Sequence, residues 1–172
     1  MKHPVKRLVF DAILTAVALT IFVIELHIPL SVGVPGVKLG LSNIVTVAAV
    51  FVLGPADAAG ILLARILLGG IFSGQVMALW YSLAGGFCCY LSMLVTHKVL
   101  DESQIWLASV IGAVFHNIGQ LLAAAAVTRT FAVFWYFPIL MVTGILTGLF
   151  TGVAAQFTAK RVAKVIRKWH AT

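Results

Sequence analysis

Several polar side chains that could bind a solute lie inside apolar stretches of this sequence. His116, Asn117 and Gln120 fall in the middle of one apolar run, and Arg65 falls in the middle of another. At helical spacing, residues 116 and 120 stack on one face with 117 beside them, so the three form one polar stripe. An arginine facing lipid costs about 2.5–3.5 kcal/mol, and we therefore expect Arg65 to face a partner or a wet cavity.

Further polar residues are expected in the outer half of the membrane, closer to its outer surface than Arg65 and His116. They are Glu25, Lys38, Asn43, Tyr81 and Ser82, which complete the predicted solute-binding set. We predict a polar pocket that opens outward and ends near Arg65 and His116. Two interpretations of Arg65 stay open: a structural ion pair with Glu25, or a contact with a carboxylate or phosphate of the solute. Hydrogen bonds that only join membrane helices contribute about 0.6 kcal/mol each, which is the alternative for the whole set.

Motifs of the common enzyme classes are missing. The sequence has no G-x-S-x-G, Walker A or HExxH motif, and no DDxxD-type cluster that would bind magnesium diphosphate. Cys88 and Cys89 are neighbours in an apolar run and point about 100° apart on a helix, so we expect them to pack rather than to form a disulfide or a metal site. We predict no catalytic residue, no cofactor and no metal.

The composition indicates that these residues are positioned by membrane-spanning helices. Of 172 residues, 62% are apolar and 10% are charged, whereas a soluble domain has about a quarter of its residues charged. We predict an all-α polytopic membrane protein with one transmembrane domain over residues 1–172 and a basic cytoplasmic tail at 159–172. The six predicted spans are residues 8–26, 39–53, 57–72, 76–95, 105–127 and 138–158. The basic start resembles a secretory signal, but the apolar stretch runs on to Ile24 and meets Glu25, so we expect the first span to be retained.

The distribution of basic residues predicts the orientation. With a cytoplasmic N-terminus, nine of the twelve Lys and Arg residues lie inside, Lys38 and Arg129 lie outside, and Arg65 lies within a span. The positive-inside rule therefore places both termini in the cytoplasm, in the plasma membrane of a bacterium. No nucleic-acid partner is expected, because no folded polar surface lies between the basic clusters. The basic tail either contacts anionic lipid headgroups or is a solvated helix end.

Small residues recur at four-residue steps on two of the predicted helices. Gly144, Gly148 and Gly152 form a small-residue face for close helix contact, either within the bundle, which we predict, or between two copies of the chain. Ala12 and Ala16 lie one turn apart on the first helix.

Four ordered motifs carry a family resemblance. They are PGVKLGLSN at 35–43, RILLG at 65–69, YSLAGG at 81–86 and HNIGQ at 116–120. Over residues 8–160 the chain resembles the Gx transporter family, which is often labelled "heptaprenyl diphosphate synthase component I"; Ser42 departs from the alanine more often expected there.

That family is in turn similar to the S components of energy-coupling factor (ECF) transporters. The resemblance implies a six-helix substrate-binding subunit of an importer, which captures a small vitamin-like or anionic solute and works with a T component and two ATPase subunits. An A-x-x-x-A face on the first helix docks the T component in S components, and Ala12 and Ala16 match that pattern. The synthase label implies a different function, an accessory membrane subunit of isoprenoid synthesis that holds a prenyl chain. A structural membrane partner without a ligand is the third alternative. A vitamin-like solute needs a polar pocket, whereas a prenyl chain needs an apolar groove.

Overall fold

The fold is a bundle of α-helices. The computed structural model describes residues 4–27, 40–74 and 76–171, which contain six α-helices and two short 3-10 helices. In chain order these are α1 (Pro4–Leu26), α2 (Asn43–Val52), α3 (Pro55–Ser73), α4 (Val76–Val99), η1 (Glu102–Gln104), α5 (Ile105–Thr128), η2 (Phe131–Tyr136) and α6 (Phe137–Ala171).

Five of the six helices are long and apolar enough to cross a membrane, so the chain is a multi-pass membrane protein. The exception is α2, which corrects the predicted span at 39–53. Its ten residues reach about 15 Å, roughly half of the bilayer's hydrocarbon thickness. Seven of the ten residues of α2 are buried and none is exposed, so the apolar run there reflects a helix enclosed by its neighbours rather than one that spans the bilayer.

An ion pair shows that the chain nevertheless returns across the bundle between α1 and α3. Nη2 of Arg7, in the first turn of α1, lies 2.6 Å from Oδ1 of Asp57, in the first turn of α3. These two helices therefore start at the same end of the bundle. The end of α2 lies near this level as well, because the Phe51 ring contacts the ring of His97 near the end of α4, with 5.1 Å between centroids.

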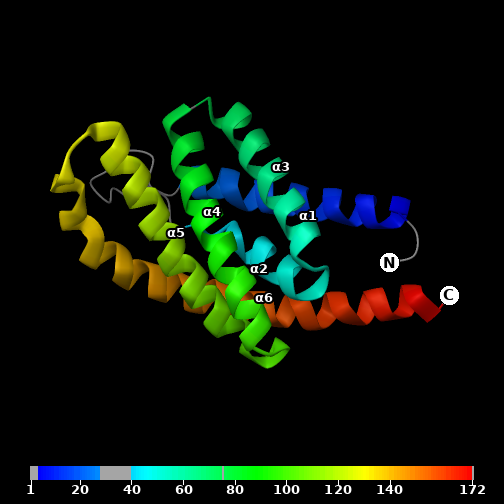
Figure 1. The fold of residues 1–172 in the computed structure, drawn as a ribbon. Coiled ribbons are helices and arrows are strands. Elements are labelled where there is room, and N and C mark those ends of the chain that lie inside the picture. The colour runs from blue at the N-terminus through cyan, green and yellow to red at the C-terminus, as the bar shows by residue number, and fades with distance from the viewer. Residues whose placement is uncertain (1–3, 28–39, 75, 172) are drawn as a thin grey trace.

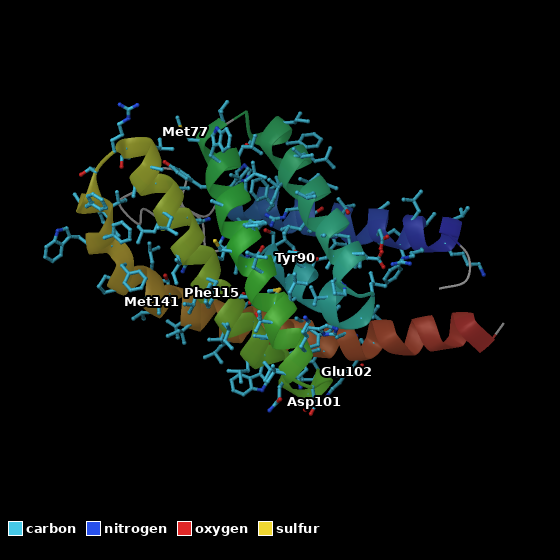
Figure 2. All side chains as sticks on the ribbon, viewed as in Figure 1. Met77, Tyr90, Asp101, Glu102, Phe115 and Met141 are labelled. Carbon is cyan, nitrogen blue, oxygen red and sulfur yellow. The ribbon has the colours of Figure 1, made fainter. Side chains whose placement is uncertain are left out.

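Both described chain ends lie at one end of the bundle, where Figure 1 marks N and C near each other. α5 runs antiparallel to α4, and α6 runs antiparallel to α5. We call this the basic end, defined by the start of α1, the turn between α4 and α5, and the last part of α6. Asp101 and Glu102 mark that turn in Figure 2, far from Met77 near the start of α4. Nearly all described Lys and Arg residues outside the spans lie at the basic end.

The sixth helix is longer than predicted. We expected a span at 138–158 followed by a tail, but α6 continues as one helix for 35 residues, or about 52 Å. No proline or glycine interrupts it beyond Gly152, which explains why the apolar span and the basic tail form one helix. The other long helices start and end within four residues of the predicted spans.

Glycine and proline set the boundaries of α3. Gly54 adopts a φ of 105°, and Pro55 follows it at the first helical position, where its missing N–H is no loss. Gly74 ends the helix in the left-handed conformation, and its N–H donates to the carbonyl of Gly70. The sequence signals for these two turns are therefore local ones.

Candidate functional site: a buried polar cluster

Arg65 lies in the middle of α3 and is 2% exposed. Its Nη2 donates to Oδ1 of Asn43, the first residue of α2, across 3.1 Å. Its Cζ lies 5.9 Å from the centroid of the Phe22 ring on α1, which is within the range of a cation–π contact. Glu25, one turn further along α1, is close enough for its charge to act on the guanidinium. Residues of α1 and α2 therefore enclose this arginine of α3, and its guanidinium has almost no exposed surface.

His116 occupies the middle of α5 and lies between two carboxamides. Its Nδ1 is 3.1 Å from Nδ2 of Asn43, and its Nε2 is 3.0 Å from Nε2 of Gln120 one turn along α5. All three side chains are buried. Arg65, Asn43, His116 and Gln120 thus form a continuous chain of contacts across α3, α2 and α5, which we call the polar cluster.

Two glycines make room for the imidazole ring of His116. A Cβ added to Gly85 on α4 would lie 2.8 Å from Cε1 of His116 and 2.8 Å from Cγ of Gln120. A Cβ added to Gly40 would lie 2.9 Å from Cδ2 of the same ring. Contacts this short leave no space for a side chain, so glycine is required at both positions. Both glycines stand within the motifs that carry the family resemblance, but sequence reasoning did not assign them to the site.

Glu25 connects the end of α1 to the start of α2. Its Oε1 accepts a hydrogen bond from the N–H of Gly40 at 2.5 Å. Gly40 has a φ of 75°, a left-handed conformation that residues with a side chain rarely adopt. The same residue therefore contacts the carboxylate of α1 and the imidazole of α5.

Asn117 does not join the polar cluster, which corrects the prediction of one polar stripe. Its Nδ2 donates to the carbonyl of Leu140 on α6 across 2.6 Å. A Cβ added to Gly144 would lie 2.6 Å from the same nitrogen. Adjacent positions on a helix point about 100° apart, so residues 116 and 117 face different neighbouring helices.

The remaining predicted solute-binding residues are Tyr81, Ser82 and Lys38, and they are not among the four residues of the polar cluster. Tyr81 is buried in an apolar group with Leu121, Ala124 and Val133, and Ser82 is buried beside it in the chain. Lys38 lies outside the described residues. The structure thus brings together Glu25, Asn43, Arg65, His116 and Gln120 from the predicted set.

Three buried polar atoms in or beside the polar cluster have no hydrogen-bond partner among the described residues. They are Nε of Arg65, Oγ of Ser42 and Oδ1 of Asn117. A buried donor or acceptor left unsatisfied costs about 1–3 kcal/mol, and more for a charged group. Within the polar cluster itself, the Nε–H of Arg65 is therefore a donor that the described helices leave unused. Among all the residues that the structure describes, no group of three or more His, Cys, Asp or Glu side chains could hold a metal ion.

Hydroxyl groups are also buried nearer the basic end. Ser92 and Thr96 on α4 each donate to a carbonyl three residues earlier, and Thr151 on α6 donates to Thr147 four residues earlier. Helical backbone therefore satisfies these hydroxyls, and they extend no path from the polar cluster.

One cavity has a mostly apolar lining, unlike the polar cluster. It is a groove of about 650 Å³ on the side of the bundle, between α3, α4 and α5. Figure 2 shows Tyr90 beside α3, and its hydroxyl donates to the carbonyl of Pro55. The lining is almost entirely apolar: Ala59, Leu62, Leu63, Ile66, Trp80, Leu83, Ala84, Phe87, Tyr90, Ala123, Ala126 and Val127. Sequence reasoning did not predict this groove, because its residues come from three helices that each look like an ordinary span.

The two small-residue faces differ in their surroundings. Gly148 and Gly152 pack against α5, where added Cβ atoms would lie 2.7 Å from Cα of Val110 and 2.6 Å from Cα of Trp106. With Gly144 they hold α6 against α5 within one copy of the chain. Ala12 and Ala16 instead lie on the exposed face of α1, whose apolar residues Leu8, Val9 and Ile13 are exposed as well.

Comparison with known proteins gives one match. Residues 14–158 match the family described as "heptaprenyl diphosphate synthase component I". No curated protein and no solved structure matches the chain.

Proposed function

Since the chain belongs to the heptaprenyl diphosphate synthase component I family, and since it encloses the polar cluster described above, we propose that it is the solute-binding membrane subunit of an importer resembling ECF transporters. It captures a small polar solute, vitamin-like or carrying an anionic group, from the outside. It has no catalytic residue and no ATPase of its own, and partner chains supply the energy.

The polar cluster is the observation that carries this proposal. It combines residues of α2, α3 and α5 in the middle of the bundle, and it includes a buried arginine whose Nε–H has no partner among the described residues. Bracing alone would favour a closed set of hydrogen bonds, because each unsatisfied buried group is costly. A solute that accepts a hydrogen bond from Arg65 would remove that cost on binding.

The orientation follows from charge. The basic end holds Lys98 and the described basic residues of α6, so the positive-inside rule places it in the cytoplasm. With the basic end inside, α2 occupies the inner half of the bundle. The polar cluster lies at the outer end of α2. This direction suits capture from outside.

The exposed face of α1 supplies a surface for the transporter partner. Ala12 and Ala16 allow a second helix to approach closely, and the resemblance to S components makes a T component the expected partner. The T component in turn binds the two ATPase subunits.

A second function is favoured by one observation, the apolar groove. A prenyl chain is apolar throughout, and a groove of about 650 Å³ lined by α3, α4 and α5 matches that chemistry. Combined with the family description, the groove supports an accessory subunit that holds a prenyl chain for diphosphate synthesis.

Native mass spectrometry of the purified protein distinguishes these two functions. For the importer subunit we expect a bound polar molecule that is lost in Arg65→Gln and retained in Ala126→Phe. For the prenyl-binding subunit we expect a bound isoprenoid with the opposite response, because Ala126→Phe fills the groove and Arg65→Gln leaves it intact. A wild-type preparation that carries neither kind of molecule contradicts both functions and favours a structural partner without a ligand.

A further inference from the structure

We propose that Arg65, Asn43, His116 and Gln120 form a hydrogen-bond relay with a fixed direction, in which Asn43 positions His116 as a neutral ring with its proton on Nε2. The relay goes beyond the proposed function, since it requires no ligand.

The direction is set at Arg65. A guanidinium has only N–H donors, so the atom of Asn43 that meets Nη2 must be the carboxamide oxygen. The other end of this carboxamide is then the NH2 group, and it lies 3.1 Å from Nδ1 of His116. Because the NH2 group can only donate, Nδ1 must accept through its lone pair and carries no proton.

The state of the rest of the ring follows from this. An imidazole without a proton on Nδ1 is neutral and carries its proton on Nε2. That N–H can only donate, and the group that it meets at 3.0 Å is the carboxamide of Gln120. Gln120 must therefore present its oxygen to His116, with its carboxamide turned end for end from the orientation in which its Nε2 faces the ring. The two ends of a carboxamide have nearly the same shape, so this orientation fits the same space.

The surroundings keep the ring from turning away from this arrangement. His116 is 3% exposed. Gly40, in the turn before α2, and Gly85, on α4, lie against its ring. The charged or titratable groups that face the relay from the neighbouring described elements are Arg65 on α3, Glu25 on α1 and Cys89 on α4. A proton added at Nδ1 would force the Asn43 carboxamide to turn, and its NH2 group would then meet the guanidinium of Arg65, donor against donor. The relay therefore makes Asn43 the residue through which α2 controls the protonation of His116.

Nitrogen NMR of ¹⁵N-histidine-labelled protein in detergent tests the relay without any ligand. The sample is a variant in which His116 is the single histidine, with glutamine replacing His3, His27, His97 and His170. We expect one unprotonated ring nitrogen, Nδ1, and one protonated nitrogen, Nε2, near neutral pH. A protonated Nδ1, in either a neutral or a charged ring, would overturn the relay.

Two variants in the same background separate positioning by Asn43 from the other contacts of the ring. In Asn43→Asp both oxygens accept, so His116 must supply a proton at Nδ1, and the Nδ1 signal shifts to the protonated position. In Gln120→Met the ring loses its acceptor at Nε2 but keeps Asn43, so the Nδ1 signal stays unprotonated. A ring that is unchanged in Asn43→Asp, or that changes in Gln120→Met alone, would overturn the role of Asn43. The spectrum with Asn43 intact decides the direction even where Asn43→Asp does not fold.

Discussion

Nη2 of Arg65 on α3 donates to Oδ1 of Asn43, the first residue of α2, across 3.1 Å in the interior of the bundle. This contact fixes the start of a half-length helix to the middle of a full span. From there α2 continues to the level of the basic end. The polar cluster therefore lies at the first residue of α2 and not along its length. The short helix therefore determines the depth of the candidate site.

Replacing Arg65 by glutamine is expected to weaken solute binding more than it lowers stability. Loss of a charge-assisted hydrogen bond costs on the order of 1.5–3 kcal/mol, or roughly ten- to a hundredfold in affinity. Affinity for the molecule identified by native mass spectrometry and the melting temperature are measured on the same samples, with Arg129→Gln as an exposed control. A large fall in melting temperature with unchanged affinity would leave Arg65 a bracing role only.

Gly40→Ala is expected to destabilise the protein more than Gly74→Ala. Both glycines adopt left-handed φ values, 75° and 63°, which cost an alanine about 1–2 kcal/mol. Only the Cβ at position 40 meets a neighbour, since that at position 74 has nothing within 4 Å. The difference between the two melting temperatures in detergent reports the contacts of the added Cβ with His116 and Asn43. Equal decreases would mean that the ring moves aside freely.

Asp57→Asn is expected to loosen α1 at the basic end. The carboxylate of Asp57 accepts hydrogen bonds from both Nε and Nη2 of Arg7, and an amide cannot replace a charged acceptor for both. Proteolysis or hydrogen exchange of the first turns of α1 reports the change. The exchanged pair, Arg7→Asp with Asp57→Arg, should restore protection; a double variant as labile as Asp57→Asn would argue against the ion pair.

Ala12→Leu and Ala16→Leu are expected to reduce association with a T component while leaving the fold intact. Both positions are exposed on α1, so a larger side chain prevents close approach by a partner without entering the bundle. Co-purification with the transporter core measures the effect, and Ala132→Leu, at an exposed alanine of η2, serves as the control. Normal yield for both α1 variants would refute the docking role.

Reporter fusions test the orientation of the bundle. Fusions at the N-terminus, near Lys98 and at the C-terminus should all report the cytoplasm, because all three sites lie at the basic end. An external signal from the 98–103 turn would reverse or break this topology.

The sequence by itself determined the class of protein and most of the helices. Twenty-residue apolar runs have few alternatives to a membrane helix, since lipid offers no partner for exposed backbone groups. The sequence also singled out Arg65, His116 and Gln120, because the cost of burying a polar side chain in a span holds whatever its neighbours are. Gly54, Pro55 and Gly74 similarly determined their turns through local backbone geometry.

Only the tertiary structure decided how these elements meet. Whether the run at 39–53 spans the membrane depends on the neighbours that enclose it, and they limit its helix to Asn43–Val52. Asn117 contacts α6 while His116 contacts α2, a choice set by where two other helices pack and not by the spacing along α5. The apolar groove exists because α3, α4 and α5 do not pack closely along their whole length. Packing between distant segments is a property of side-chain shape summed over the whole bundle, which no local pattern in the chain records.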